Sequence, residues 1–140
     1  MKVYLASPFF NENEISIVDK AENILRNKGL DVWSPREHEV RDHETGTRKW
    51  SEDTFLNDKD NIDTADLMVM LYHGGYSDTG TAWECGYAFA KKVPCIVVHV
   101  GSNSNLMVHE GCYSNLNGLD ELEKYDFTEL PRKNYEGAMF

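Results

Sequence analysis

Several features that mark other protein classes are missing from this sequence of 140 residues. Positive charge is scarce: 14 Lys and Arg stand against 24 Asp and Glu, a net charge of −10. Because this charge repels nucleic acids and anionic membranes, we expect neither as a partner. No apolar run approaches the ~20 residues that span a bilayer, and the first residues enter a strand pattern directly, so we expect no signal peptide. The length predicts one domain, residues 1–140.

Cysteine is also scarce, and the common nucleotide-binding motifs are absent. Cys85, Cys95 and Cys112 show no CxxC spacing, which predicts reduced thiols in a cytoplasmic protein. Cys85 has no histidine near it in sequence, so we interpret it as a small buried residue. Neither GxGxxG nor GxxxxGK[ST] occurs. His38 and His43 match no metal-ligand spacing and are interpreted as part of a solvated charged loop, so we expect no metal and no organic cofactor.

What the chain does contain is an alternation of apolar runs and helix-periodic segments. Unbroken apolar runs between helices indicate a parallel sheet covered on both faces, a flavodoxin-like or Rossmann-like α/β fold. The segment 36–49 has no apolar period and predicts a long surface loop, while the turn-rich segment 103–117 predicts one helical turn. We predict strands at 2–7, 30–33, 67–72 and 94–100, and helices at about 15–28, 50–65, 80–92 and 119–124.

The segment 77–88 is the most informative for function. A Gly/Asp/Thr turn follows the predicted strand 67–72 and leads into a helix expected to carry Glu84 in its first turn. Ligands of open α/β folds bind at the carboxyl ends of strands, where a helix N-terminus favours an ionised carboxylate. Such a carboxylate suits attack on an electrophilic carbon. Two structural alternatives stay open: Thr81 and Glu84 fit a capping box, and Asp78 fits a turn residue that caps the helix.

A second carboxyl group, Asp58, lies in an amphipathic stretch. We expect Phe55, Ile62 and Ala65 to form the inner face of this helix, which can turn Asp58 inward while Asp60 faces solvent. A partly buried carboxyl group near other carboxylates has a raised pKa and can donate a proton.

Taken together, these motifs resemble those of nucleoside 2-deoxyribosyltransferases, nearly from end to end. The Asp-x-Gly-Thr-x-x-Glu-x-Gly motif is shared with a wider superfamily of N-glycosidic enzymes, whereas the Asn-Leu-Met and Tyr-Glu-Gly motifs are narrower signals. From its position alone, Asn105 also fits a turn residue that opens a helical turn. The matching segments are Val3–Phe10, Asn57-Asp58, Asp78–Ala88, Asn105-Leu106-Met107 and Tyr135–Ala138 with its aromatic end.

The resemblance implies a role for each matching residue. Glu84 corresponds to the nucleophile that attacks the anomeric carbon and forms a covalent 2-deoxyribosyl-enzyme. Asp58 corresponds to the group that protonates the departing base, and Tyr4 to a tyrosine beside the nucleophile. Base contacts are expected from among Arg36, Glu37, His38 and Glu39. The implied substrate-binding residues are Asp78 and Asn105 at the sugar 5′-hydroxyl, Phe9 and Phe10 beside the base, and Met107 and Phe140.

The resemblance further implies exchange of the bases of 2′-deoxyribonucleosides in nucleoside salvage, by a ping-pong route with retention. It implies a homo-oligomer, either a hexamer of three dimers or a dimer. The C-terminal tail, about 125–140, is expected to dock on a neighbouring subunit and close the site. Several family members end in tyrosine where this chain has Phe140, which removes a phenol hydrogen bond.

Two other functions remain alternatives at this point. One is a 2′-deoxynucleoside 5′-monophosphate N-glycosidase, which would transfer the sugar to water. Asp78 argues against it, because a carboxylate beside the 5′-substituent repels a phosphate. The other is a non-catalytic nucleoside-binding module, which would not need the combination of Glu84, Asp58 and Tyr4.

Overall fold

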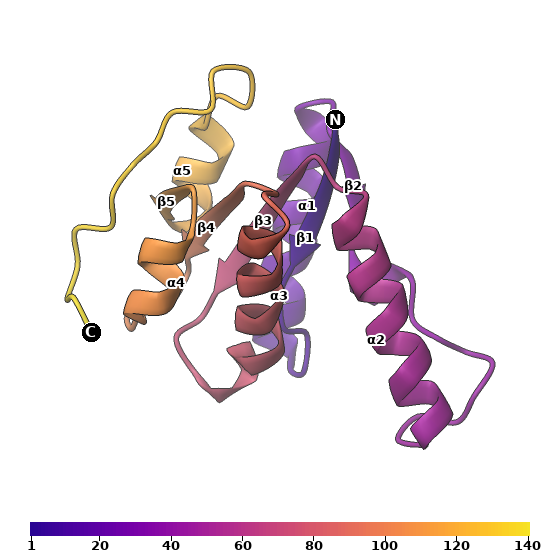
Figure 1. The fold of residues 1–140 in the computed structure, drawn as a ribbon. Helices are drawn as coiled ribbons and strands as arrows, with labels where there is room; N and C mark the ends of the chain where they lie inside the picture. The colour runs from indigo at the N-terminus through magenta and orange to yellow at the C-terminus, as the bar shows by residue number, and fades with distance from the viewer.

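A parallel sheet of five strands forms the centre of the molecule (Figure 1). The computed structural model describes residues 1–140. The strand order is β2-β1-β3-β4-β5 with every pair parallel, which is the flavodoxin-like order and confirms the predicted fold class. The strands are β1 (Lys2–Ala6), β2 (Asp31–Trp33), β3 (Leu67–Tyr72), β4 (Cys95–His99) and β5 (Ser114–Asn117).

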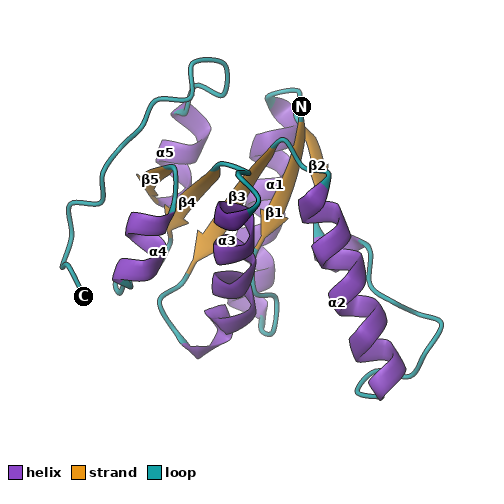
Figure 2. Ribbon diagram, in the orientation of Figure 1, coloured by secondary structure: helices purple, strands orange, loops and turns teal.

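Helices cover both faces of this sheet (Figure 2). Side chains alternate along each strand, so that Val3 and Leu5 of β1 enter one core and Tyr4 and Ala6 enter the other. Helices α1 (Glu12–Asn27) and α5 (Gly118–Lys124) close the first core, and α2 (Arg48–Asp63), α3 (Thr79–Ala90) and α4 (Leu106–Gly111) lie on the opposite face. Two short 3₁₀ turns complete the fold, η1 (Pro35–Glu37) and η2 (Tyr76–Asp78). None of the helices has the length and apolar character required to cross a membrane.

The structure corrects two sequence predictions. The segment 103–117 contains not only the expected helical turn, now α4, but also the fifth strand, β5, which pairs with β4. Its sequence Ser-Asn-Leu-Asn has one apolar residue and therefore carries no strand signal. In α2, Phe55 does not face inward but is 49% exposed, and Ile62 alone is buried, because most of α2 extends beyond the edge of the sheet (Figure 1).

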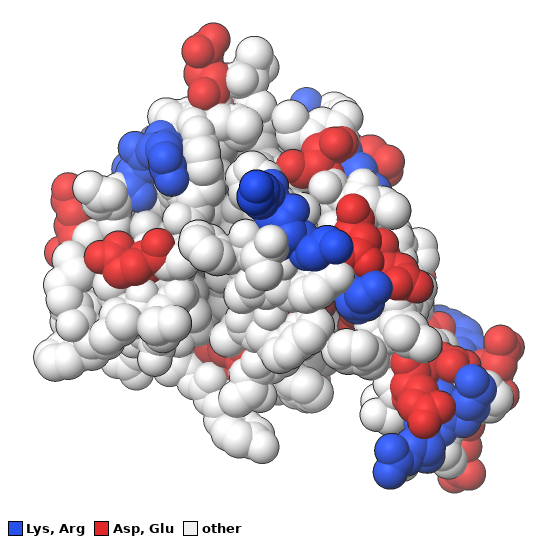
Figure 3. Space-filling view, viewed as in Figure 1, with Lys and Arg blue, Asp and Glu red and all other residues white.

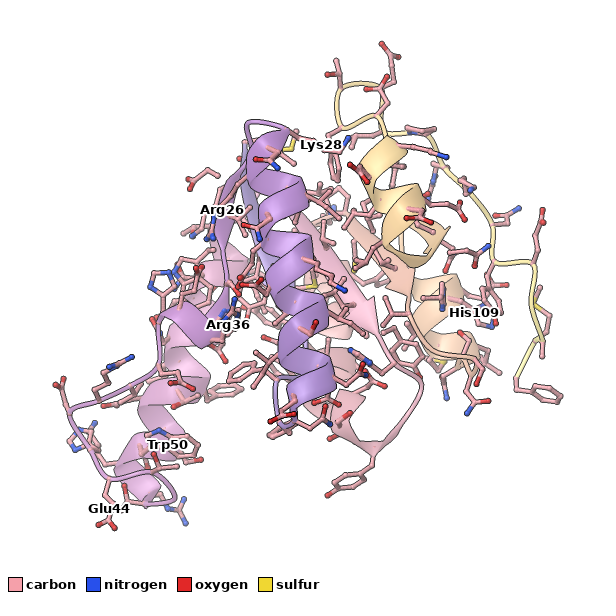
Figure 4. The ribbon with its side chains drawn as sticks, turned by 180° about the vertical axis from the view of Figure 1, so that it is seen from behind. Arg26, Lys28, Arg36, Glu44, Trp50 and His109 are labelled. Atoms are coloured by element: carbon pink, nitrogen blue, oxygen red, sulfur yellow. The ribbon has the colours of Figure 1, made fainter.

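Much of the C-terminal tail packs on its own chain. The Asn115 N–H donates to the Lys133 carbonyl oxygen at 2.9 Å. The ring of Tyr135 lies between those of His99 and His109, with centroid distances of 4.6 and 4.5 Å; Figure 4 shows His109 beside this part of the chain. Phe140 at the end is 78% exposed. Docking of the tail, about 125–140, on a neighbouring subunit stays a prediction, and most side chains of residues 131–140 are exposed in the single chain.

The buried side chain of Asn115 connects the tail to the sheet. Its amide donates to the carbonyl oxygens of His109 at 3.0 Å and Lys133 at 3.3 Å, and its oxygen lies 2.8 Å from His99 Nε2. Asn115→Ala leaves these groups unpaired, so we expect the free energy of unfolding in urea to fall by about 2–3 kcal/mol and trypsin to cleave faster after Lys133. Asn117→Ala, which changes an exposed neighbour on β5, should alter stability by less than about 0.5 kcal/mol. Equal cleavage rates for the two variants would contradict this role of Asn115.

Candidate active site

A cavity of about 1280 Å³ opens at the carboxyl ends of β1 and β3. The strand order reverses between these two strands, which is where ligands bind in open α/β folds. Three parts of the chain line the cavity: the loop after β1, the turn after β3 with the start of α3, and α2 with the loop before it. The residues that form these walls are Ser7–Phe10, Tyr76, Ser77, Thr79–Thr81, Glu84, Pro35, His38–Arg41, His43–Thr45, Trp50, Thr54, Asn57 and Asp58.

Glu84 lines the cavity from α3, and its carboxylate accepts a hydrogen bond from the Tyr4 hydroxyl. Burial raises the pKa of Glu84 to about 8, the bond from Tyr4 acts in the opposite direction, and the charge of Asp58 raises it further. This corrects the expectation that the helix N-terminus holds Glu84 ionised. Helix α3 begins at Thr79, so Glu84 lies beyond the first turn, where the effect of the helix dipole has faded.

The capping-box alternative for Glu84 is also wrong. The N-cap of α3 is Asp78, so Thr81 lies inside the helix and cannot cap it. Glu84 accepts its hydrogen bond from the hydroxyl of Tyr4 on β1, and not from a backbone N–H at the start of its own helix. The side chain of Glu84 therefore does not cap its own helix.

Tyr4 is fully buried in β1 and faces α3. Burial, together with the charges of Glu84 and Asp58, raises the pKa of Tyr4 well above its usual value. The phenol therefore remains protonated and acts as a permanent donor to the carboxylate. Its ring stacks on Trp33 at 5.3 Å, and Trp33 stacks in turn on His38 at 4.6 Å, so an aromatic column runs from the buried donor to the cavity wall.

Asp58 lines the same cavity from α2, while Asp60 is exposed, as the sequence predicted. Burial raises the pKa of Asp58 to about 6. Because the charge of Asp58 raises the pKa of Glu84, the two ionisations are linked, and the pair holds one proton between about pH 6 and pH 8. The arrangement supplies one carboxyl group for proton transfer and one carboxylate for attack or charge stabilisation.

Of the six remaining predicted site residues, two line the cavity and four do not. Phe9 and Phe10 line the cavity with their rings stacked 6.4 Å apart. Asp78 is buried and does not line it; its oxygens accept the N–H groups of His73 at 3.0 Å and Gly75 at 2.8 Å. It therefore shapes the turn after β3, as its structural alternative predicted, but its side chain does not cap α3.

Three further residues stay outside the cavity of the single chain. Asn105 caps α4 by accepting the Met107 N–H at 2.9 Å, as its structural alternative predicted. Met107 and Phe140 are 76% and 78% exposed. None of these side chains is among those that line the cavity.

Of the four candidates for base contact, two line the cavity and two are paired with α1. Arg36 is paired with two acidic side chains of α1, and Glu37 with an arginine of the same helix. Figure 4 shows Arg36 directed toward α1. His38 and Glu39, in contrast, line the cavity. His38 is exposed, as its interpretation as part of a solvated charged loop predicted, and the stack on Trp33 also holds its ring at the cavity wall.

The sequence analysis assigned no role to Trp50, Thr54 or Ser77, which also line the cavity. Ser77 directly precedes the predicted residue Asp78, and Thr54 lies one turn before Asp58 on α2. This proximity was the only available signal. Cys85 is 3% exposed and has a free thiol, in agreement with the interpretation of it as a small buried residue. No three His, Cys, Asp or Glu side chains gather in a geometry suited to a metal ion.

Comparison with known proteins identifies relatives of this chain. The family model described as nucleoside 2-deoxyribosyltransferase matches residues 3–118. A nucleoside deoxyribosyltransferase of Lactobacillus leichmannii is 30% identical over 65% of this chain and 60% of that protein. One of Limosilactobacillus fermentum is 26% identical over 99% of this chain and 88% of that protein. The alignment thus spans less than two thirds of the L. leichmannii protein.

A solved structure also matches this chain over nearly its whole length. The 2-deoxyribosyltransferase of Bacillus psychrosaccharolyticus superposes with a TM-score of 0.90 and 38% identity, over 96% of this chain and 99% of that one. A conserved protein of Enterococcus faecalis superposes over 71% of this chain and 63% of that one, with 29% identity and a TM-score of 0.59.

The hydrogen bond from Tyr4 to Glu84 can be tested by titration. Tyr4→Phe removes the donor that favours the ionised carboxylate, so the pKa of Glu84 should rise from about 8 by about 1, the equivalent of one hydrogen bond. Carbon-13 NMR of the glutamate carboxyl carbons measures this value directly. Tyr87→Phe is the matched control, since that phenol donates to Asp63 on the surface. If the pKa of Glu84 is the same in both variants, the bond does not control its ionisation.

Proposed function

The chain belongs to the nucleoside 2-deoxyribosyltransferase family, and on that premise we propose that it exchanges the bases of 2′-deoxyribonucleosides in the cavity beside β1 and β3, as an enzyme of nucleoside salvage. The observation that carries the proposal is a pair of carboxyl groups with unequal pKa values, Glu84 and Asp58, on two walls of one cavity. A pure binding site for a neutral ligand would gain nothing from burying two acids.

The reaction follows from the positions of these groups. The Glu84 carboxylate attacks the anomeric carbon, the bond to the base breaks, and the base leaves with the proton of Asp58. An incoming base then attacks the same carbon, returns a proton to Asp58 and releases Glu84. Two inversions give net retention, as in retaining glycosidases. The carboxylate also stabilises the oxocarbenium-like transition state, and the Tyr4 hydroxyl keeps it oriented.

The proton must move before the first step. The reaction requires ionised Glu84 and protonated Asp58, whereas pKa values of about 8 and about 6 place the shared proton mainly on Glu84. The reactive arrangement is then the minor form of the singly protonated protein. A bound base that accepts a hydrogen bond from Asp58 favours this arrangement, which couples substrate binding to activation of the nucleophile.

A second copy of the chain is proposed to complete the site. Asp78 and Asn105 are assigned to the sugar 5′-hydroxyl, with Met107 and Phe140 as further substrate contacts, although none of these four side chains lines the cavity of the single chain. Support comes from exposed apolar side chains: Leu106 (46%), Met107 (76%), Met139 (59%) and Phe140 (78%). Charges gather instead on the lobe at lower right in Figure 3, where α2 starts, and leave much of the face over α3 and α4 uncharged. Such a surface is typical of an interface.

Base exchange by Glu84 is tested with deoxyinosine, with and without adenine or cytosine, and chromatography of the products. The wild-type protein should form a new deoxynucleoside only when the acceptor base is present. Glu84→Ala should lose this activity by about 10³-fold or more, because the covalent step has no other nucleophile. Glu52→Ala changes an exposed glutamate of α2 and should retain full activity.

Two other outcomes would contradict transfer. Free base released equally with and without acceptor would identify a hydrolase, and deoxynucleoside monophosphates would then be the substrates to compare. Binding of deoxynucleosides without turnover would identify a binding module.

The role of Asp58 predicts a change in pH dependence. In the wild type, kcat/KM should be bell-shaped with limbs near pH 6 and pH 8. In Asp58→Asn it should fall by about 10²-fold and lose the alkaline limb, because no acid remains to deprotonate. The one remaining limb should be the ionisation of Glu84, at a pH below about 8, since the charge that raises the pKa of Glu84 is gone. Asp60→Asn, at an exposed position of the same helix, should keep both limbs. A bell-shaped profile in Asp58→Asn would exclude it as the acid.

A further inference from the structure

Glu14 is a buried carboxylate that the proposed reaction does not use. It lies in the first turn of α1 and is 4% exposed. Its backbone N–H donates to the side chain of Asn11, the N-cap of the helix, at 2.9 Å. A glutamate at this position commonly bonds back to the chain just before its helix, and Glu14 does so by accepting the Phe10 N–H at 2.9 Å.

Local capping does not explain its other oxygen. Glu14 Oε2 accepts the hydroxyl of Ser77 at 2.6 Å, across 63 residues of sequence. Ser77 belongs to η2, the turn after β3, while Phe10 belongs to the loop after β1. Both Phe10 and Ser77 line the cavity, whereas Glu14 lies behind them and does not. One carboxylate thus joins two walls of the site.

No other hydrogen bond joins the loop after β1 to the turn after β3. None of the backbone hydrogen bonds outside the helices and strands joins residues 7–10 to residues 73–78. The Ser7 hydroxyl bonds to the next residue, and Asp78 bonds within its own turn. Beyond the last paired residues of β1 and β3, Ala6 and Met70, the two loops are connected through Glu14.

The charge on Glu14 suits this connection. Burial acts to raise its pKa, but the bonds from Ser77 and Phe10 and the nearby His73 outweigh burial and lower it. The group is therefore ionised, and hydrogen bonds to a carboxylate are about twice as strong as those between neutral groups. His73, from the turn after β3, is the titratable group that faces it.

We propose that Glu14 is a positioning residue that holds the Phe9–Phe10 loop against the turn carrying Ser77 and so sets the shape of the substrate cavity. This proposal rests on the proposed function in assigning that cavity to the nucleoside. Glu14 touches no substrate; it acts through Phe10 and Ser77. Its loss loosens the walls that bind the ground state and the transition state alike, which raises KM more than it lowers kcat.

The experiment compares Glu14→Met, which keeps length and volume but has no acceptor, with Glu14→Gln, which can accept from Phe10 and donate to Ser77. Glu14→Met should raise KM for deoxyinosine about 10-fold with kcat within about 3-fold of the wild type, and Glu14→Gln should restore KM to within about 3-fold. Glu12→Met, at an exposed position of the same helix, is the matched control and should leave both constants unchanged. In the double variant with Ser77→Ala, KM should be no higher than in Glu14→Met alone.

A readout without substrate separates this proposal from the proposed function. Amide hydrogen exchange of Phe10 should become at least 10-fold faster in Glu14→Met, because its acceptor is lost, and residues 73–78 should exchange faster with it. Unchanged exchange in these two segments, or an unchanged KM in a folded Glu14→Met variant, would overturn the role of Glu14. If Glu14→Met does not fold, the exchange of Phe10 in Ser77→Ala decides: an unchanged rate overturns the proposal. Failure of the wild type to exchange bases would instead overturn the proposed function, while the exchange rates still decide on Glu14.

Discussion

The candidate site depends above all on one buried hydrogen bond, from the Tyr4 hydroxyl to the Glu84 carboxylate. Burial makes the carboxylate costly, and the phenol compensates part of that cost without supplying a charge. A group held near its ionisation point can be ionised, protonated or covalently bound with small changes in energy. Under the proposed function, the site gives up some stability in order to keep Glu84 reactive, as is common for functional carboxyl groups.

The second carboxyl group comes from a very different part of the fold. Asp58 lies on α2, most of which extends beyond the sheet and buries one residue, Ile62. Glu84, the proposed nucleophile, is thus held by the rigid core, while Asp58, the proposed proton donor, is carried by a helix that contributes little to that core. Because the two groups are on separate elements, movement of α2 changes the distance between them and with it their mutual effect on ionisation.

The sequence predicted the parts of this structure that rest on local patterns. Strands β3 and β4 are continuous apolar runs, and α1 shows a clear helical period, so their positions were predicted closely. Strand β5 was missed because its polar residues Ser114 and Asn115 are stabilised by hydrogen bonds to the tail, which no hydrophobic pattern reports. Phe55 was placed inward because its spacing is helical, but spacing does not tell whether a helix face meets the sheet.

The sequence by itself determined the fold class, the family and the identity of the acidic residues, since these reside in short motifs and in periodicity. Tertiary structure alone decided the state of those residues. The pKa of Glu84 is set by burial and by Tyr4, which is 80 positions away in the chain. Tertiary structure also decided that His38 and Glu39 face the cavity, while Arg36 and Glu37 form ion pairs with side chains of α1. Desolvation and charge pairing depend on neighbours brought together by folding, and adjacency in sequence does not reveal them.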